Sequence, residues 1–434
     1  MPDIMNFANG AIYNNGRYNN IIYYDENIDY LTVAKSPVTA YNGLNILCER
    51  LRPRPFFCLR DRARINMKKK LLSIVEAMGG GVFTYIVEMS NALTRYFDVS
   101  VAYAVRGETP ENFRDYFLPE VHLYEVKHFT RSPHPAKDYK AFFEIRELVR
   151  EIQPDLIHLH SSKAGILGRW AIDGKKFPLF YTPHAYSFLM TNYDPFRRKL
   201  YYELEKAAAK KPCLTISCSY GEHLETLKLT ENAVYINNGI DVDCIEEELA
   251  DCETREENYR EPVVYTIGRI CYQKNPVLFN ETAEKLPGLS FVWIGDGDMR
   301  ASLTSENIEI TGWMNRNEVL RSANRGDIFL LTSYWEGLAI SLLESMAMKK
   351  LCIVSDVIGS RDVIRDGENG FICHTAEEFA DRIRWAQENP EKAKALAEQA
   401  YRDAKEQYDV SIVAEKYRDV YEGTYQKFHE KEKG

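Results

Sequence analysis

Short apolar runs alternate with longer segments of helical periodicity through most of the chain. A run of four to six residues that is apolar on both faces is typical of a strand buried in a parallel sheet. The segments between the runs repeat their apolar residues every three or four positions, as helices do. The predicted strands cover residues 71–76, 155–160, 177–184, 214–219, 234–236, 263–267, 291–294, 308–311, 328–331 and 351–354. Strands that alternate with helices in this way predict an α/β protein built on parallel sheets.

The alternating pattern stops once and then restarts, which divides the chain. Residues 237–241 (Asn-Asn-Gly-Ile-Asp) are a turn cluster that we interpret as a hinge, and the Glu-rich residues that follow have no apolar period. At 434 residues the chain is also long for a single core. Near its end, Val413, Tyr417 and Tyr421 lie on one stripe of a predicted helix over 410–428. We therefore predict four segments, which are 1–66, 67–245, 246–408 and 409–434.

Residues 1–66 differ from the rest of the chain. Asn and Tyr dominate as far as Asn45, and an arginine-rich stretch follows. Because no helical or alternating period persists, we predict a poorly ordered extension that is dispensable for activity. A basic arm that contacts a membrane is the alternative.

Composition excludes several classes of protein. An apolar content of 45% and a charged content of 27% are those of an ordinary soluble protein. The net charge of −9 gives no general affinity for nucleic acid. The sequence shows neither an apolar run as long as a membrane span nor a signal-peptide pattern, so we expect a cytoplasmic protein. The nine cysteines lack the paired spacing of a structural zinc site.

Two carboxylates stand out around the predicted strand 328–331. Glu336 lies in the loop after the strand and Glu344 lies in the helix that we predict from Leu338, so eight steps of about 100° leave them roughly 80° apart. Both could reach one ligand at the helix start, where the free N–H groups of Gly337 and Leu338 suit a phosphate. A carboxylate suits sugar hydroxyls because it only accepts hydrogen bonds. A surface helix with two solvated glutamates is the alternative.

Other loops at predicted strand ends carry candidate chemistry. Arg269 and Lys274 bracket the loop that begins at Gly268, and together they could hold a diphosphate. Three glycines (79–81) after the first strand allow a ligand to approach the backbone, although a tight strand-to-helix turn explains them equally well. His184 ends the predicted strand 177–184, at the edge where ligands of parallel sheets bind, whereas His158 faces inward as a structural residue.

In this order, the glycine loop, the histidine loop, Gly-Arg-x4-Lys and Glu-x7-Glu resemble the retaining glycosyltransferases of family four. The resemblance covers about residues 67–430, with Ala339 and Ser345 where the family usually has proline and alanine. It implies the GT-B fold, in which two Rossmann-like domains face each other across a cleft and the C-terminal helix crosses back to the first domain. It implies a first domain that binds the acceptor and a second that binds a nucleotide sugar.

The resemblance also implies roles for individual residues. His184, Arg269, Lys274 and Glu336 would be catalytic. The donor site would comprise Gly268, Arg269, Lys274, Gly295, Trp313, Glu336, Gly337, Leu338 and Glu344. The acceptor side would comprise Gly80, Gly81, Ser162, Lys163 and His184, with His160 as a weaker candidate.

The implied reaction moves a hexose or N-acetylhexosamine from a nucleotide sugar, UDP favoured over GDP, with retention of configuration. Within the family the chain looks most like enzymes that assemble bacterial surface polysaccharides (capsule and exopolysaccharide) on lipid-linked acceptors. No cofactor or metal is implied, and we interpret Asp296 and Asp298 as a glycine turn near the nucleotide. A nucleotide-sugar epimerase of the same fold and an inactive scaffold subunit are the alternatives, while the missing dinucleotide fingerprint disfavours a dehydrogenase.

The aromatic and basic stretch 188–211 suggests contact with the inner face of the cell membrane. Glu203 and Glu205 dilute its charge, so a plain solvated helix is the alternative.

Overall fold

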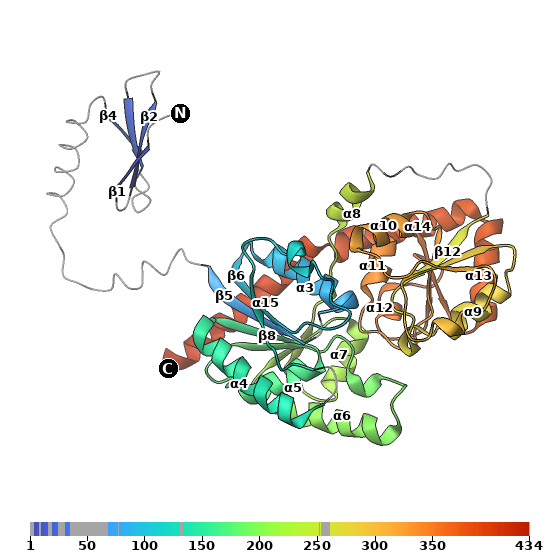
Figure 1. The fold of residues 1–434 in the computed structure, drawn as a ribbon, viewed down its shortest axis with the longest axis horizontal. Coiled ribbons are helices and arrows are strands. Elements are labelled where there is room, and N and C mark those ends of the chain that lie inside the picture. Colours follow the sequence, from blue (N-terminus) through green and yellow to red (C-terminus); the bar gives the residue numbers. More distant parts are fainter. Residues whose placement is uncertain are drawn as a thin grey trace. The chain divides into compact units, whose positions relative to one another are not determined.

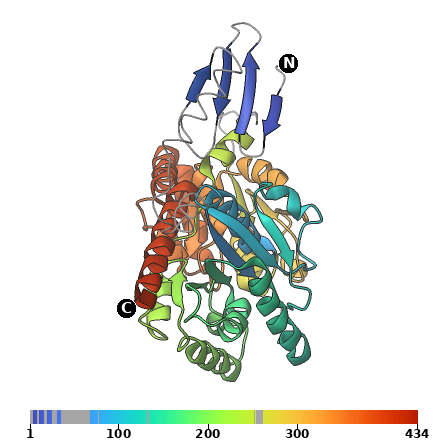
Figure 2. The same ribbon diagram turned by 90° about the vertical axis from the view of Figure 1, so that its left-hand side faces the viewer.

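The chain forms two compact units, Met1–Met67 and Lys68–Gly434. The computed structural model describes residues 4–7, 10–15, 20–24, 31–34, 68–76, 78–130, 133–250, 252 and 261–433. Figure 1 and Figure 2 show the ribbon from two directions.

The first unit contains a four-stranded antiparallel sheet. Its strands are β1 (Ile4–Phe7), β2 (Gly10–Asn15), β3 (Asn20–Tyr24) and β4 (Leu31–Ala34), in that order. This corrects the prediction that 1–66 lacks regular structure, for these four segments. Isoleucine and tyrosine favour strands, and the asparagines at 14, 15 and 20 fall at strand ends, where they obscure the alternation without preventing pairing. Dispensability of 1–66, and poor order in its other residues, which lie outside the described ones, remain predictions.

The second unit begins with a parallel sheet in the order β11-β10-β9-β8-β5-β6-β7. Together with its helices we call this the first half. Its strands are β5 (Lys69–Val75), β6 (Phe97–Tyr103), β7 (His122–Glu125), β8 (Leu156–His160), β9 (Leu179–Thr182), β10 (Leu214–Ser217) and β11 (Ala233–Tyr235). Its helices are α3 (Gly80–Leu93), α4 (Pro135–Ile152), α5 (Ser162–Ala171), α6 (Pro195–Ala208) and α7 (Tyr220–Leu227). The chain order reverses between β5 and β8, which places a ligand-binding edge at their carboxyl ends.

The second half repeats this design with a parallel sheet in the order β14-β13-β12-β15-β16-β17. Its strands are β12 (Val263–Ile267), β13 (Ser290–Ile294), β14 (Ile308–Ile310), β15 (Ile328–Leu331), β16 (Leu351–Ser355) and β17 (Phe371–Cys373). Its helices are α9 (Pro276–Glu284), α10 (Arg316–Asn324), α11 (Ile340–Ala347), α12 (Ser360–Val363), α13 (Ala376–Glu388) and α14 (Pro390–Gln407), and α8 (Val242–Leu249) precedes β12. The reversal here lies between β12 and β15, whose buried apolar residues anchor the two loops that carry the candidate charges.

The last helix, α15 (Val410–Lys433), returns to the first half, as predicted (Figure 1). Tyr417 and Tyr421 are each only 1% exposed. The hydroxyl of Tyr85 on α3 donates to Tyr417 at 2.8 Å, and His158 on β8 shares a 2.6 Å hydrogen bond with Tyr421. His158 is therefore structural, as expected. Among the described helices, none has the length and apolar character needed to cross a membrane.

Candidate functional site

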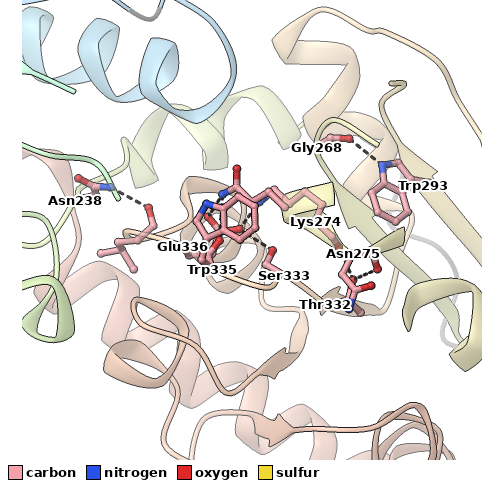
Figure 3. Close-up of polar contacts among 11 residues, drawn as sticks. Asn238, Gly268, Lys274, Asn275, Trp293, Thr332, Ser333, Trp335 and Glu336 are labelled. Carbon is pink, nitrogen blue, oxygen red and sulfur yellow. Dashed lines mark hydrogen bonds and ion pairs between the residues drawn. The ribbon is translucent and has the colours of Figure 1, made fainter. Parts of the chain in front are cut away.

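The ion pair between Lys274 and Glu336 lies where the second sheet reverses its chain order. Lys274 follows β12 and Glu336 follows β15, and their Nζ and Oε1 atoms are 2.8 Å apart. The two side chains are only 16% and 7% exposed, so the charges are largely withdrawn from water. Figure 3 shows the pair between the loops that follow the two strands. The sequence predicted both residues, and the structure brings them into direct contact.

Neighbouring polar side chains fix Glu336. The hydroxyl of Ser333 donates to Oε1 at 2.6 Å, and the Gln273 amide donates to Oε2 at 3.3 Å (Figure 3). Gln273 also donates to the carbonyl oxygen of Trp335 at 3.1 Å, which ties the two loops together. Sequence reasoning missed Ser333 and Gln273, although both lie in loops that it singled out. Their hydrogen bonds hold the Glu336 carboxylate in one orientation.

The glycines beside this pair allow close backbone packing. Gly268 and Gly295 have φ of 143° and 136°, which side chains rarely tolerate. A Cβ on Gly295 would lie 2.3 Å from the Gly268 carbonyl oxygen, to which the Trp293 indole donates at 2.8 Å (Figure 3). Gly268 also borders Lys274, since a Cβ there would come within 3.2 Å of the lysine Cε. Both predicted glycines therefore lie at the carboxyl edge next to the ion pair.

Arg269 points from the second half toward the first. Its Nη1 atom is 2.7 Å from Oε1 of Glu108, which lies in the segment after β6, and both side chains are 32% exposed. A diphosphate could compete with Glu108 for this guanidinium, because phosphate oxygens accept the same forked hydrogen bonds as a carboxylate.

Glu344 occupies a different environment from Glu336. It lies within α11, is 3% exposed, and pairs with Arg316 of α10. The helix begins at Ile340 with Ala339 as its N-cap, two residues later than predicted, because Ala339 is extended with ψ of 120°. Gly337 and Leu338 therefore belong to the loop. The two glutamates thus make separate ion pairs, Glu336 with Lys274 and Glu344 with Arg316.

Gly337 and Leu338 form one of the contacts with the first half. A Cβ on Gly337 would lie 2.8 Å from the backbone nitrogen of Ala185. The side-chain amide of Asn238, in the predicted hinge, donates to the Leu338 carbonyl oxygen at 2.9 Å (Figure 3). The histidine loop and the glutamate loop thus meet directly across the two halves.

His184 is held in an unusual backbone conformation. His184 and Ala185 have φ of 52° and 71°, in the left-handed region. Buried Glu222 secures this turn by accepting from the backbone N–H of Ala185 at 2.7 Å and from that of Cys218 at 2.8 Å. Sequence reasoning missed Glu222. The signal was the capping-box pattern Ser219-x-x-Glu222, which would have marked the start of α7.

Burial keeps His160 and His184 uncharged near neutral pH. Burial lowers the pKa of His184 to about 3, and it lowers the pKa of His160 well below its usual value. The two rings share a hydrogen bond of 3.1 Å between His160 Nδ1 and His184 Nε2. Tyr85 packs against His184 with ring centroids 4.8 Å apart. His184 is therefore suited to hydrogen bonding and poorly suited to act as a general base.

The other predicted acceptor residues lie at the amino ends of two helices. Gly80 begins α3 with φ of 56°, and a Cβ on Gly81 would lie 3.6 Å from Ile340 of the second half. Ser162 begins α5. Lys163 is engaged with Asp138 at 2.7 Å and with the hydroxyl of Thr130 at 2.8 Å.

Two further predicted positions lie at the outer strands of the second sheet. Trp313, three residues after the end of β14, is 64% exposed. Asp296 uses both carboxylate oxygens, one toward Arg300 at 2.7 Å and one toward the backbone of Gly297 at 2.8 Å. Asp296 is thus engaged as part of a glycine turn.

Two family models match this chain, one on each half. "Glycosyltransferase Family 4" covers residues 79–244, and "Glycosyl transferases group 1" covers residues 250–403. The two matched families together with the two parallel-sheet domains identify a glycosyltransferase of the GT-B type. The chain belongs to family four of the glycosyltransferases, as its sequence motifs predicted.

Curated relatives and solved structures agree with this assignment. A UDP-Gal:alpha-D-GlcNAc-diphosphoundecaprenol alpha-1,3-galactosyltransferase from Escherichia coli is 28% identical over 287 residues, which cover 59% of this chain and 72% of the relative. An N,N'-diacetylbacillosaminyl-diphospho-undecaprenol alpha-1,3-N-acetylgalactosaminyltransferase from Campylobacter jejuni is 25% identical, covering 79% and 96%. Sucrose-phosphate synthase from Thermosynechococcus elongatus shares the fold with a TM-score of 0.71 at 15% identity, covering 83% and 100%. Anabaena HepE in complex with UDP-glucose gives 0.66 at 17% identity, covering 82% and 100%.

Proposed function

We propose that this glycosyltransferase moves a hexose or N-acetylhexosamine from a nucleotide sugar, UDP favoured over GDP, to a lipid-linked precursor of a bacterial surface polysaccharide. The observation that carries the proposal is the buried Lys274–Glu336 pair, which faces the His184 loop of the other half across the Gly337 contact. A cation suits the leaving diphosphate and a carboxylate suits sugar hydroxyls. Few ligands other than a nucleotide sugar need a cation and a carboxylate at the same place in a site.

The charge that develops in the reaction matches the residues at this edge. Cleavage of the sugar–phosphate bond leaves negative charge on the diphosphate and positive character on the sugar ring. Lys274 would stabilise the diphosphate once it replaces Glu336 as the partner of the ammonium group, and Arg269 would exchange Glu108 for phosphate oxygens. Glu336 would then accept hydrogen bonds from sugar hydroxyls. Gly268 and Gly295 would let the nucleotide approach the backbone.

The acceptor would be activated without a protein base. With a pKa of about 3, His184 would hold a proton poorly, so we assign it a hydrogen bond to the sugar or acceptor. The departing phosphate would help to remove the acceptor proton, which is consistent with attack on the same face and retention of configuration. The relatives' names specify alpha linkages, the outcome that retention gives from an alpha-linked nucleotide sugar. Metal would not be required, because Arg269 and Lys274 supply positive charge.

A lipid-linked acceptor requires contact with a membrane, for which α6 offers a surface. Phe196, Leu200 and Leu204 form a stripe at helical spacing with exposed fractions of 79%, 48% and 41%. Cations surround it, since Arg197 stacks on Tyr193 at 4.1 Å and Lys211 lies 4.2 Å from the ring of exposed Trp170. An apolar stripe flanked by cations fits an anionic lipid surface. We propose that α6 docks on the inner face of the cell membrane.

The test is a transfer assay preceded by a binding screen. Purified protein is scanned by thermal shift against UDP- and GDP-sugars, because a ligand of the native state raises Tm with its occupancy. The sugar that stabilises is then supplied with undecaprenyl-diphosphate-linked saccharides, and elongation is followed by mass spectrometry. We expect one sugar to be added with its configuration retained. Interconversion of the free nucleotide sugar without an acceptor would instead identify an epimerase, and neither binding nor transfer would identify a scaffold.

A further inference from the structure

A single guanidinium joins the two halves beside Glu344. Arg316 is the first residue of α10, and its Nη1 contacts Oε1 of Glu344 on α11. Its Nη2 lies 2.6 Å from Oε1 of Glu88, which belongs to α3 of the first half. The Arg316 side chain therefore contacts both halves, so its orientation depends on how they lie relative to each other.

These contacts matter because all three side chains are largely withdrawn from water. The side chains of Glu344, Glu88 and Arg316 are only 4%, 10% and 22% exposed. A carboxylate this buried requires a counter-charge. Burial raises the pKa of Glu88 to about 8, so its protonated form prevails at neutral pH. Burial by itself lowers the pKa of Arg316. The neighbouring Glu344 and Glu88 outweigh burial and raise this pKa above its usual value. The positive charge of Arg316 is thus matched mainly by Glu344.

The position of the contact links it to movement of the halves. Glu88 and Arg316 both line a cavity of about 470 Å³ whose walls come from α3, α8, α10 and α15. A separation of the halves would break the Glu88 contact and leave the Glu344 contact within the second half. The guanidinium would then have lost one of the two groups that fix its orientation.

We propose that Arg316 is a positioning residue that orients Glu344 for the nucleotide sugar, and that Glu88 couples this orientation to the approach of the first half. The proposal rests on the proposed function, which supplies the nucleotide sugar. In this arrangement Glu344 uses one oxygen for Arg316 and keeps its other for the donor. Residues outside the motif therefore determine the orientation of Glu344, the second carboxylate of Glu-x7-Glu.

The experiment measures donor binding and kinetics in Arg316→Ala and Arg316→Lys. We expect Arg316→Ala to raise the donor Kd and KM about tenfold or more, the effect of one charge-assisted hydrogen bond. The kcat at saturating donor and the acceptor KM should stay within about twofold, which general damage to the fold would not produce. Arg316→Lys should restore part of the affinity, because it keeps the charge. Unchanged or tighter donor binding in Arg316→Ala, with Tm retained, would overturn the proposal.

Two further variants separate positioning from nonspecific effects. Glu88→Ala should weaken donor binding a few-fold and add nothing to Arg316→Ala, since both act through the same guanidinium. Arg321→Ala is the matched control, because Arg321 lies on the same helix but pairs with Glu248 at 2.8 Å. Additive effects of the Glu88 and Arg316 changes, or an equal loss in Arg321→Ala, would refute the coupling.

Measurements on the wild-type protein distinguish failure of the proposed function from failure of this inference. If it binds no nucleotide sugar, both the proposed function and this inference fail. If it binds one and transfers it normally while Arg316→Ala is silent, only the inference fails.

Discussion

The two facing edges of the enzyme differ in the charge of their candidate ligand-binding groups. The second half keeps a full ion pair, Lys274 with Glu336, at 2.8 Å. The first half brings two imidazoles within 3.1 Å and keeps both uncharged through burial. A paired lysine can exchange its carboxylate for a diphosphate without exposing a lone charge. A neutral imidazole can contact a sugar without drawing the diphosphate away. The difference suits a donor on one side and an acceptor on the other.

The two edges also differ in how their backbones are held. Beside its ion pair the second half places glycine at two unusual φ values, Gly268 and Gly295, and asparagine at a third, Asn275 with φ of 49°, all residues that adopt such conformations at low cost. The first half places His184 and Ala185 in the left-handed region, at a cost of about 1–3 kcal/mol each. Glu222 offsets that cost with two backbone hydrogen bonds. The first edge therefore depends on a distant residue, and the second depends mainly on its own loops.

The largest effect should follow removal of the charge from the second edge. Lys274→Ala should lower kcat/KM about a hundred- to a thousandfold, the usual effect of losing one group that stabilises developing charge. Steady-state kinetics with the donor found in the screen would measure it. Lys285→Ala is the control, because this lysine of the same half forms an exposed pair with Glu377. A loss below about threefold would show that the ion pair is structural and would remove the contrast between the edges.

Disruption of the first edge should damage stability and acceptor use while sparing the donor site. Glu222→Ala leaves the N–H groups of Ala185 and Cys218 without their partner, which should cost about 2 kcal/mol of unfolding free energy. Chemical denaturation would measure this, with Glu222→Gln losing less because its amide oxygen still accepts one bond. Nucleotide binding should stay within about twofold of wild type. Equal damage to nucleotide binding would mean that the edges are not independent.

These predictions depend on residues that differ in how readily the sequence reveals them. The positions of Arg269, Lys274 and Glu336 could be predicted because each lies in a short loop directly after an apolar strand, whereas their roles follow only from the family resemblance. The two parallel sheets and the returning α15 could be predicted for the same reason, since their periodicity is local. Glu88 could not, because its partner Arg316 lies far along the chain, and the local pattern at Glu222 marks only the start of α7 and not its contact with Ala185.

Separation along the chain explains most of what sequence reasoning missed. Glu88 and Arg316 are 228 residues apart, and no period connects them. The environment of Glu344 was missed for this reason, although its place in the helix was predicted. The low pKa of His184 was missed for a different reason, which is burial. The sequence marked His184 as a candidate, but its low pKa arises from the tertiary packing around it.

A smaller effect should distinguish hydrogen bonding from base catalysis at His184. His184→Asn should lower kcat/KM only about tenfold, because asparagine can still hydrogen-bond. The shapes of the wild-type and variant pH–rate profiles should coincide, since a group with a pKa of about 3 does not titrate near neutrality. An ionisation near neutral pH that disappears in His184→Asn would make His184 the base and contradict this view of the first edge.

The same substitution should change the acid sensitivity of folding. The folded-state pKa of His184 is lowered from 6.5 to about 3, so between these values the unfolded chain binds a proton that the native chain does not. The neutral histidine's contribution is complete above pH 6.5 and is lost as the pH falls, by at most about 1.4 kcal/mol per pH unit. His184→Asn should therefore lose less stability than wild type on acidification. Parallel curves from urea denaturation would show that His184 is not desolvated.

The smallest expected effect is that of removing divalent metal. The second edge already carries two cations, Arg269 and Lys274, that can meet a diphosphate. Asp296, a carboxylate near this edge that could be considered for a metal, is engaged with Arg300 and Gly297. Initial rates with a chelator should therefore stay within about twofold of untreated enzyme, with magnesium added back as the control. A strict loss that magnesium restores would show that the two cations do not suffice, and the contrast between the charged Lys274–Glu336 pair and the uncharged histidines would then have to include a metal ion.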